Sequence, residues 1–235
     1  GPWLYYFIQI LFDRYKSIVA AETSGLVTNT FITKEIFSDE YTPTCFDEFI
    51  PFFISDRYNH YLYSRIIAIR SKIPFNYVEE SQLESSATLD FTQHKHLSYK
   101  RRIFDTTRRI ISYFSKFSTR EIIFVSTYFS KLDQTRLELS LGQLPYLISP
   151  NVNIPNSQMD YEKRSRLTLK DSKDEFLTLL KSLLPGQIPK CHIEAYKAVR
   201  DQTLNAYPTR PQAIFTANAY LGNEGFKLWA AESAQ

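Results

Sequence analysis

Two polar stretches carry the side chains that could bind or react with a substrate. They are "STYFSKLDQTR" (residues 126–136) and "TANAYLGNEG" (residues 216–225). Each follows a short apolar run and precedes a segment with helical periodicity. In open parallel sheets, ligands bind beyond the carboxyl ends of the strands, and the amides at a helix N-terminus suit phosphate or carboxylate. We therefore expect any ligand to contact these two loops.

In the first stretch, hydroxyl side chains stand in front of a charged pair. The hydroxyl-bearing residues are Ser126, Thr127, Tyr128 and Ser130. Asp133 and Arg136 follow, about one helical turn apart. In a structural interpretation, Ser130 caps the helix, Asp133 completes the cap and Arg136 is solvated. In a functional interpretation, Arg136 or the loop amides bind an anionic group of a ligand.

The second stretch crowds five polar side chains into ten residues. They are Thr216, Asn218, Tyr220, Asn223 and Glu224. Asn223 can simply cap the final helix. A turn at the end of a strand does not demand Asn218, so a ligand contact is a serious alternative there. Neither stretch contains G-x-G-x-x-G or a P-loop, so the spacing predicts no nucleotide motif.

His60 is the histidine with a candidate catalytic role. It lies in the aromatic-rich stretch "DRYNHYLYSR" (residues 56–65). A packed, hydrogen-bonded histidine is one interpretation. A general base is the other, because an imidazole titrates near neutral pH. The sequence shows no Ser/His/Asp set and no pair of carboxylates beside His60.

Cysteines and histidines lack the spacing of a metal site. Cys45 and Cys191 form no CxxC or Cys/His pattern, which indicates reduced thiols of a cytosolic protein. His94 and His96 are the one close pair of histidines, and they lie in a basic stretch. We therefore expect no metal site and no covalently bound cofactor.

A basic stretch, "HKHLSYKRRIFDTTRR" (residues 94–109), offers a different kind of site. Its cations are Lys95, Lys100, Arg101, Arg102, Arg108 and Arg109. They could meet the phosphates of nucleic acid or of an anionic lipid surface, or they could be the solvated start of a helix. The formal net charge is only +3, which is low for a nucleic-acid-binding protein. Nucleic acid is therefore the weakest of these alternatives.

The hydrophobic pattern predicts a helix-rich chain. We expect helices over residues 3–22, 44–54, 55–72, 102–118, 131–143, 172–184 and 189–207, and from residue 223 onward. The first helix has apolar residues on nearly every face, so we expect it to be largely buried. Its apolar run, residues 3–12, is too short to span a bilayer. A helix on a membrane surface remains the alternative to a buried one.

Capping residues and helix breakers set several of these boundaries. Candidate N-caps are Thr44, Ser55 or Asp56, and Ser172. Ser172 is followed by Glu175 three positions later, which predicts a capping box. Pro185 and Gly186 are expected to end that helix.

Few strands are legible, and they predict a small parallel sheet. The unbroken apolar run Ile122 to Val125, within residues 120–130, is typical of a strand buried on both faces. A closing strand is expected over residues 212–217 and a short one over residues 144–150. Polar segments at residues 24–43, 76–100 and 151–171 are expected to be irregular. Two βα units in a helix-rich chain predict a loose α/β architecture.

The domain boundaries follow from these elements. Residues 1–75 form an expected N-terminal helical part, and residues 76–100 a polar loop. Residues 101–235 form an expected α/β part that contains the two βα units. One domain that also includes residues 1–75 is the alternative.

Three stretches together resemble a known family. They are "FIPFFISDRYNHYLYSRII" (49–67), "IIFVSTYFSKLDQTRLELSLGQLP" (122–145) and "AIFTANAYLGNEGFKLWAAE" (213–232). They are similar to transferases found with bacterial O-antigen and surface-polysaccharide biosynthesis genes. The resemblance implies one Rossmann-like half of a GT-B-like glycosyltransferase. It also implies a cytoplasmic location, with the inner face of the cytoplasmic membrane as a refinement.

The same resemblance implies a substrate class. In GT-B enzymes the activated-sugar donor sits mainly on the C-terminal half and the acceptor mainly on the N-terminal half. We therefore expect a nucleotide-sugar donor and a glycan or lipid-linked glycan acceptor, with this chain as an acceptor-side fragment that lacks the C-terminal half. Asp133 or His60 would be the base, and Arg136 or the amides after Asn218 would stabilise the leaving phosphate.

Residues expected to bind substrate are Tyr128, Ser130, Arg136, Thr216, Asn218, Tyr220 and Asn223. Two alternatives to an enzyme remain at this point. The aromatic surplus is consistent with a non-catalytic protein-interaction module. The basic stretch is consistent with a binder of polyanions or of a membrane surface.

Overall fold

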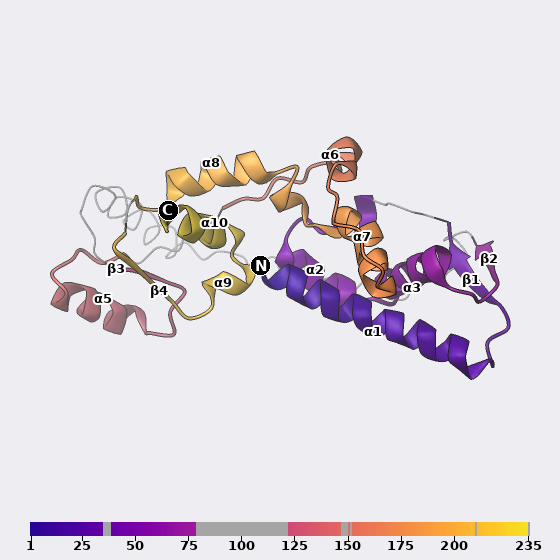
Figure 1. The fold of residues 1–235 in the computed structure, drawn as a ribbon. Helices are drawn as coiled ribbons and strands as arrows, with labels where there is room; N and C mark the ends of the chain where they lie inside the picture. The colour runs from indigo at the N-terminus through magenta and orange to yellow at the C-terminus, as the bar shows by residue number, and fades with distance from the viewer. Residues whose placement is uncertain (35–38, 79–121, 147–149, 151, 210, 235) are drawn as a thin grey trace, which may run out of the picture. The chain divides into compact units, whose positions relative to one another are not determined.

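The computed structural model describes residues 1–34, 39–78, 122–146, 150, 152–209 and 211–234 (Figure 1). The chain divides into two compact units. The first unit contains Gly1–Leu89 and Ile154–Tyr196, and the second contains Asp90–Asn153 and Lys197–Gln235. The predicted ranges 1–75, 76–100 and 101–235 stay a prediction, because the stretch that separates them lies largely outside the described residues. The basic stretch 94–109 and the helix expected over residues 102–118 lie outside the described residues, and both stay predictions.

The described elements of the first unit are mostly helices. They are α1 (Pro2–Ser24), β1 (Thr30–Thr33), η1 (Asp39–Tyr41), α2 (Phe46–Ile54), α3 (Asp56–Arg70), β2 (Phe75–Val78), α6 (Tyr161–Ser165), α7 (Glu175–Gln187) and η3 (Lys190–His192). The α-helices predicted over residues 3–22, 44–54 and 55–72 are thereby confirmed. α6 lies in the segment 151–171 that was expected to be irregular.

The helix α1 buries one face. Phe7, Leu11 and Ile18 lie in the core at the four- and seven-residue spacing of a helical stripe, whereas Tyr5 and Phe12 are 62% and 47% exposed. The expectation of a largely buried helix was therefore wrong. Aromatic residues on the outer face resemble core residues in a hydropathy pattern, although the structure leaves them in solvent.

The core of the first unit is aromatic. α1, α2, α3 and α7 contribute to one cluster, in which Tyr41 stacks on Tyr61 with ring centroids 4.3 Å apart. The Tyr58 hydroxyl donates to Gln187 Oε1 at 2.6 Å, and both side chains are buried. Burial raises the pKa of Tyr58 well above its ordinary value. The phenol therefore stays protonated and acts as a hydrogen-bond donor inside the core.

Two strands in the first unit were not predicted. β1 and β2 pair in parallel, from Thr30 opposite Phe75 to Thr33 opposite Val78. They lie in segments that were expected to be irregular or a loop. Both strands are short and half exposed, so neither shows the unbroken apolar run of a buried strand. Packing against α3 stabilises β1 instead, and Ser64 and Arg65 of that helix bond to the backbone of Thr33.

Helix caps agree with the sequence at α3 and differ at α2 and α7. Ser55 caps α3 by accepting from the Tyr58 amide. Cys45, not Thr44, occupies the N-cap of α2 and makes no side-chain cap. At α7, Asp174 replaces the expected Ser172 as the cap, and it accepts from the Leu177 amide at 2.9 Å.

Pro185 does not end α7, which continues to Gln187. Tertiary hydrogen bonds hold this last turn and offset the helical bond that proline cannot make. Thr42 Oγ1 donates to the Gly186 carbonyl at 2.7 Å, and Arg164 Nη1 donates to the Pro185 carbonyl at 2.7 Å. Local sequence signals cannot reveal such distant partners.

The described elements of the second unit begin with the predicted buried strand. They are β3 (Ile122–Val125), α5 (Lys131–Ser140), β4 (Ala213–Thr216), α9 (Ala219–Gly222) and α10 (Glu224–Ser233). α8 (Tyr196–Ala206) begins at the boundary between the units. α8 and η3 replace the single helix that was expected over residues 189–207. Residues 144–146 are not a strand, and residues 147–149 lie outside the described part of the chain.

β3 and β4 form the predicted parallel pair. The two strands lie side by side (Figure 1). Ile122 lies opposite Ala213 and Val125 opposite Thr216. Their core includes the buried Trp229, which stacks on Tyr207 with centroids 4.8 Å apart. A helix-rich chain with two small parallel sheets is compatible with the predicted α/β class. Among the described residues, no helix combines the length and apolar character that crossing a bilayer requires.

Candidate functional site at the strand ends of the second unit

The two loops predicted to bind a ligand leave the same edge of the β3–β4 pair. The register places Val125 opposite Thr216, so residue 126 and residue 217 begin the two loops side by side. The Ala217 amide donates to the Ser126 carbonyl at 3.4 Å, which continues the ladder one step beyond the strands. We call residues 126–136 and 215–223 the strand-end edge. Parallel pairing thus brings together two segments that lie far apart in the sequence.

Ser126 occupies an unusual backbone conformation at this edge. Its φ of 49° lies in the left-handed region, and it is the one non-glycine residue with positive φ among the described residues. The conformation costs roughly 1–2 kcal/mol for a residue with a Cβ atom. Such strain concentrates at sites where the chain must present particular groups. The sequence offered no signal for it, because serine is common in loops of every kind.

A buried carboxylate anchors the first loop. Thr127 Oγ1 donates to Gln134 Oε1 at 3.1 Å, and Gln134 Nε2 donates to Glu138 Oε1 at 3.1 Å. Glu138 is fully buried and its other oxygen accepts from the Tyr146 amide at 2.7 Å. This chain of bonds ties the loop to α5 and to the segment after it. These hydrogen bonds fix the position of the loop, as a binding site requires.

Ser130 and Asp133 form the helix cap of the structural interpretation. Ser130 Oγ accepts from the Asp133 amide at 3.1 Å and donates to Asp133 Oδ2 at 2.6 Å. Arg136 Nη1 lies 3.8 Å from Asp133 Oδ1, and the Arg136 side chain is 70% exposed. An exposed pair of this kind is weak, so the guanidinium is available to an anionic ligand. The catalytic role of Asp133 and the binding roles of Ser130 and Arg136 stay predictions.

In the second loop, two of the predicted residues serve the backbone. Thr216 Oγ1 accepts from the Ala219 amide at 3.0 Å, at the start of the short helix α9. Asn223 Oδ1 accepts from the Phe226 amide at 2.9 Å and caps α10. Its Nδ2 donates to the Tyr207 hydroxyl at 3.3 Å. Burial raises the pKa of Tyr207 to about 12, so this phenol is neutral at physiological pH.

Asn218 and Tyr220 are the residues that the second loop presents outward. Asn218 precedes α9, is exposed and makes no side-chain cap. In the part of the chain that the structure describes, its amide side chain has no hydrogen-bond partner. Tyr220 is 52% exposed. The interpretation of Asn218 as a ligand contact is therefore compatible with the geometry and stays a prediction.

An exposed aromatic group lies on the same edge, and the sequence did not predict it. Phe129 stacks on Phe215 with centroids 5.9 Å apart and planes within 9°. The ring centroids of Phe215 and Phe124 are also only 5.5 Å apart. Phe129 and Phe215 are 46% and 45% exposed, and Tyr128 is 84% exposed. Alternation along β4 could have revealed Phe215, because Ile214 and Phe215 must point to opposite faces.

His60 lies on α3 in the first unit, whereas Asp133 lies on α5 in the second. The strand-end edge itself thus combines flat aromatic faces, one unpartnered amide side chain and one exposed guanidinium. These groups can hold a ring with hydroxyl substituents and an attached anion. They supply recognition more clearly than acid–base chemistry.

Comparison with known proteins supplies the class of protein. Neither a curated protein nor a solved structure matches the sequence. The model of one family, described as LIC12162 family transferase, matches residues 1–235. That match covers both units and includes all three stretches on which the sequence-based resemblance rests. The chain therefore belongs to the LIC12162 family of transferases.

Proposed function

We propose that the chain is the acceptor-side part of a glycosyltransferase-like enzyme of bacterial surface-polysaccharide biosynthesis. In this proposal a sugar passes from a nucleotide-activated donor to a glycan or lipid-linked glycan, at the cytoplasmic side of the inner membrane. The observation that carries the proposal is the strand-end edge in a chain of a transferase family. A GT-B-like, Rossmann-like arrangement is part of the same proposal.

The groups on the edge suit a sugar substrate. The apolar face of a sugar ring packs well on an aromatic ring, and Phe129 and Phe215 present two such rings in parallel. The Asn218 amide can both donate to and accept from sugar hydroxyls. Arg136 would stabilise the departing phosphate, and Asp133 or His60 would accept the proton of the acceptor hydroxyl.

A binding measurement tests this proposal directly. Purified protein is titrated with a panel of nucleotide sugars and of oligosaccharide acceptors, and binding is followed by calorimetry. Asn218→Ala and Tyr128→Ala are expected to weaken binding about tenfold each, which corresponds to one lost contact of about 1.4 kcal/mol. Tyr77→Ala is the control, because Tyr77 is also an exposed tyrosine (57%) but lies on β2 of the first unit.

Sugar transfer is then assayed with the same donors and acceptors. Binding that is unaffected by both edge variants would contradict the assignment of the site. Absence of binding and of transfer with every donor and acceptor would contradict the glycosyltransferase proposal itself.

One observation favours a second candidate, a protein-interaction module. Exposed apolar side chains gather on the edge: Tyr128, Phe129, Leu132, Phe215 and Tyr220. Contiguous exposed apolar surface often marks a protein interface. In that case the unmodified protein and all variants would bind no sugar, and Tyr128→Ala and Phe129→Ser would abolish binding to a protein partner.

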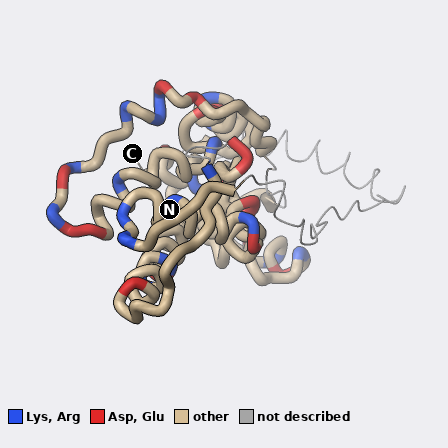
Figure 2. Tube along the Cα trace, turned by 90° about the vertical axis from the view of Figure 1, so that its right-hand side faces the viewer, with Lys and Arg blue, Asp and Glu red and all other residues tan. Residues whose placement is uncertain are grey.

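The polyanion alternative depends on residues 94–109, which lie outside the described part of the chain. In the described part, cationic and anionic residues are interspersed along the trace (Figure 2). Replacement of Arg101, Arg102, Arg108 and Arg109 by serine tests the alternative. Unchanged retention on heparin would end it.

A further inference from the structure

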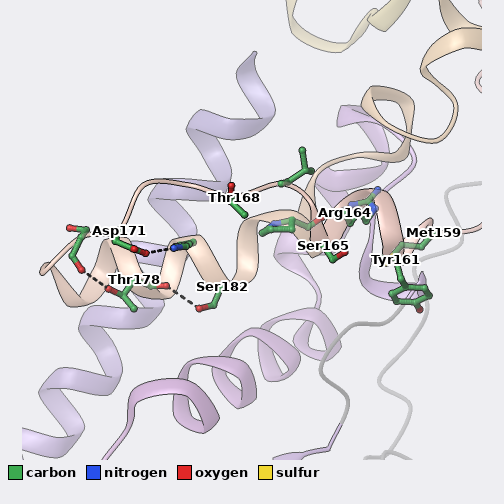
Figure 3. Close-up of a pocket in the computed structure, with 12 residues that line it drawn as sticks. Met159, Tyr161, Arg164, Ser165, Thr168, Asp171, Thr178 and Ser182 are labelled. Atoms are coloured by element: carbon green, nitrogen blue, oxygen red, sulfur yellow. Dashed lines mark hydrogen bonds and ion pairs between the residues drawn. The ribbon is translucent and has the colours of Figure 1, made fainter.

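A cavity of about 760 Å³ lies in the first unit. None of the residues that line it belongs to the strand-end edge. Its walls come from residues 159–172 and from α7. Figure 3 shows Thr168 and Asp171 on the connecting segment and Thr178 and Ser182 on the helix. A cavity of this size lies within the range that small-molecule sites occupy, roughly 300–1,000 Å³.

Buried polar contacts hold one end of the cavity in place. Arg164 lines it, and its guanidinium makes a two-bond pair with Glu194 at 2.7 Å each. Arg164 Nη1 also donates to the carbonyls of Pro185 at 2.7 Å and Ile188 at 2.9 Å. The Arg164 and Glu194 side chains are only 3% and 4% exposed. Arg164 is therefore committed to joining α6 to α7 and is not available to a ligand.

A second set of contacts holds the other end. Lys181 of α7 pairs with Asp171 of the connecting segment. Thr178 Oγ1 donates to the Ser172 carbonyl at 3.3 Å. The segment is thus attached to α7 at both ends, and the space between the attachments stays open.

The walls combine apolar surface with a single available cation. Met159, Leu167 and Pro185 supply apolar surface. Lys181 is 34% exposed, whereas the carboxylate side chain of its partner Asp171 is 97% exposed. Asp171 can therefore turn into solvent at little cost, because pairs with one fully solvated member are weak. A ligand anion can take its place beside the more sheltered ammonium.

We propose that this cavity binds an amphipathic organic anion, with its anionic group at Lys181 and its apolar body against Met159, Leu167 and Pro185. The hydroxyl of Thr168, which has no hydrogen-bond partner among the described residues, is available to a polar substituent. The proposal does not depend on sugar transfer. It assigns a second ligand site to the first unit.

Two probes with the same ring system test the proposal. Anilinonaphthalene sulfonate carries an anionic group, and phenylnaphthylamine has the same rings without it. Fluorescence titration of the folded chain is expected to show saturable binding of the sulfonate at one site and tighter binding of it than of the neutral amine. Lys181→Gln is expected to weaken the sulfonate about fivefold and to leave the neutral amine unchanged, since it removes one partly exposed charge contact.

Two further variants locate the site. Leu167→Trp fills the cavity and is expected to abolish saturable binding of both probes. Lys173→Gln is the control, because Lys173 is an exposed lysine directly after the connecting segment and does not line the cavity. Circular dichroism confirms that each variant keeps its helical content.

Three results would overturn the proposal. One is equal affinity for the two probes in the unmodified protein. Another is equal loss of sulfonate binding in Lys181→Gln and Lys173→Gln. The third is unchanged binding in a folded Leu167→Trp variant.

Discussion

The two units each contain a parallel pair of short strands, but different interactions stabilise them. In the second unit, β3 is an apolar strand with Ile123, Phe124 and Val125 buried. In the first unit, β1 buries one apolar side chain, Ile32, and polar side chains of α3 hold its end. The first unit also relies on the buried Arg164–Glu194 pair. Apolar burial is visible in a sequence, whereas polar contacts between distant segments are not.

The largest expected effect comes from the buried ion pair of the first unit. Glu194→Gln leaves the Arg164 guanidinium buried without its counter-charge, which is expected to cost about 3–5 kcal/mol of stability. In the second unit, Glu232 makes a similar two-bond pair with Arg200, but both side chains are more exposed. Glu232→Gln is therefore the matched control, and equal losses in urea unfolding would contradict the difference between the units.

The same pair predicts a pH dependence. Burial alone raises the pKa of Glu194, but hydrogen bonds from Arg164 and from the Asp160 amide outweigh it, and the pKa lies below its ordinary value. A carboxyl whose pKa is lowered on folding stabilises the protein above the unfolded pKa, about 4.3 for Glu. That stabilisation is lost as the pH falls through the lower folded value. Unfolding followed from about pH 6 to about pH 3 should therefore show a shallower acid loss in Glu194→Gln than in the unmodified protein.

Truncation within the strands tests the contrast next. Ile123→Ala in β3 is expected to cost about 2–4 kcal/mol, because Ile123 is fully buried. Phe31→Ala in β1 removes a larger side chain but is expected to cost less than about 1 kcal/mol, because Phe31 is 60% exposed. Chemical denaturation measures both losses. A loss in Phe31→Ala that matches Ile123→Ala would show that the exposed side of β1 is held by apolar contacts, in addition to the fully buried Ile32.

Removal of a polar support tests the other half of the contrast. Ser64 Oγ accepts from the Thr33 amide at 3.1 Å, and both residues are buried. Ser64→Ala is expected to cost about 1–3 kcal/mol, since it leaves a buried amide without a partner. Hydrogen exchange of the Thr33 amide should accelerate by more than that of the Val125 amide in β3. Uniform acceleration in both strands would instead indicate a general loss of stability.

The sequence predicted those features whose cause is local. The buried β3, the Ser55 and Ser130 caps, and the loops that follow β3 and β4 all have signals within a few residues. β1 and β2 were missed because their partners are distant in the sequence: α3 holds β1, and β1 pairs with β2. α7 continues past Pro185 because Thr42 and Arg164 bond to its last turn.

The sequence predicted some features of the candidate site and not others, for the same reason. The sequence predicted that the two loops of the second unit would contain the site, and parallel pairing brings those loops together. It did not reveal the stacked Phe129 and Phe215 or the strained Ser126, because stacking and φ depend on how the two loops meet. Asp133 and His60, the two candidate bases, belong to different units, which sequence spacing alone cannot establish.

The smallest expected effect concerns Ser126, at the point where β3 enters the strand-end edge. With φ at 49°, Ser126→Gly relieves the left-handed strain but adds flexibility to the unfolded chain, so the two effects nearly cancel. Ser126→Val keeps a Cβ and adds branching, and it is expected to be less stable than the glycine variant by about 1–2 kcal/mol. Thermal unfolding of the two variants measures that difference. Equal stabilities would show that the backbone at residue 126 can leave the left-handed region. The strand-end edge would then lack a fixed backbone geometry, which is the feature that distinguishes it from the more solvent-exposed strand pair of the first unit.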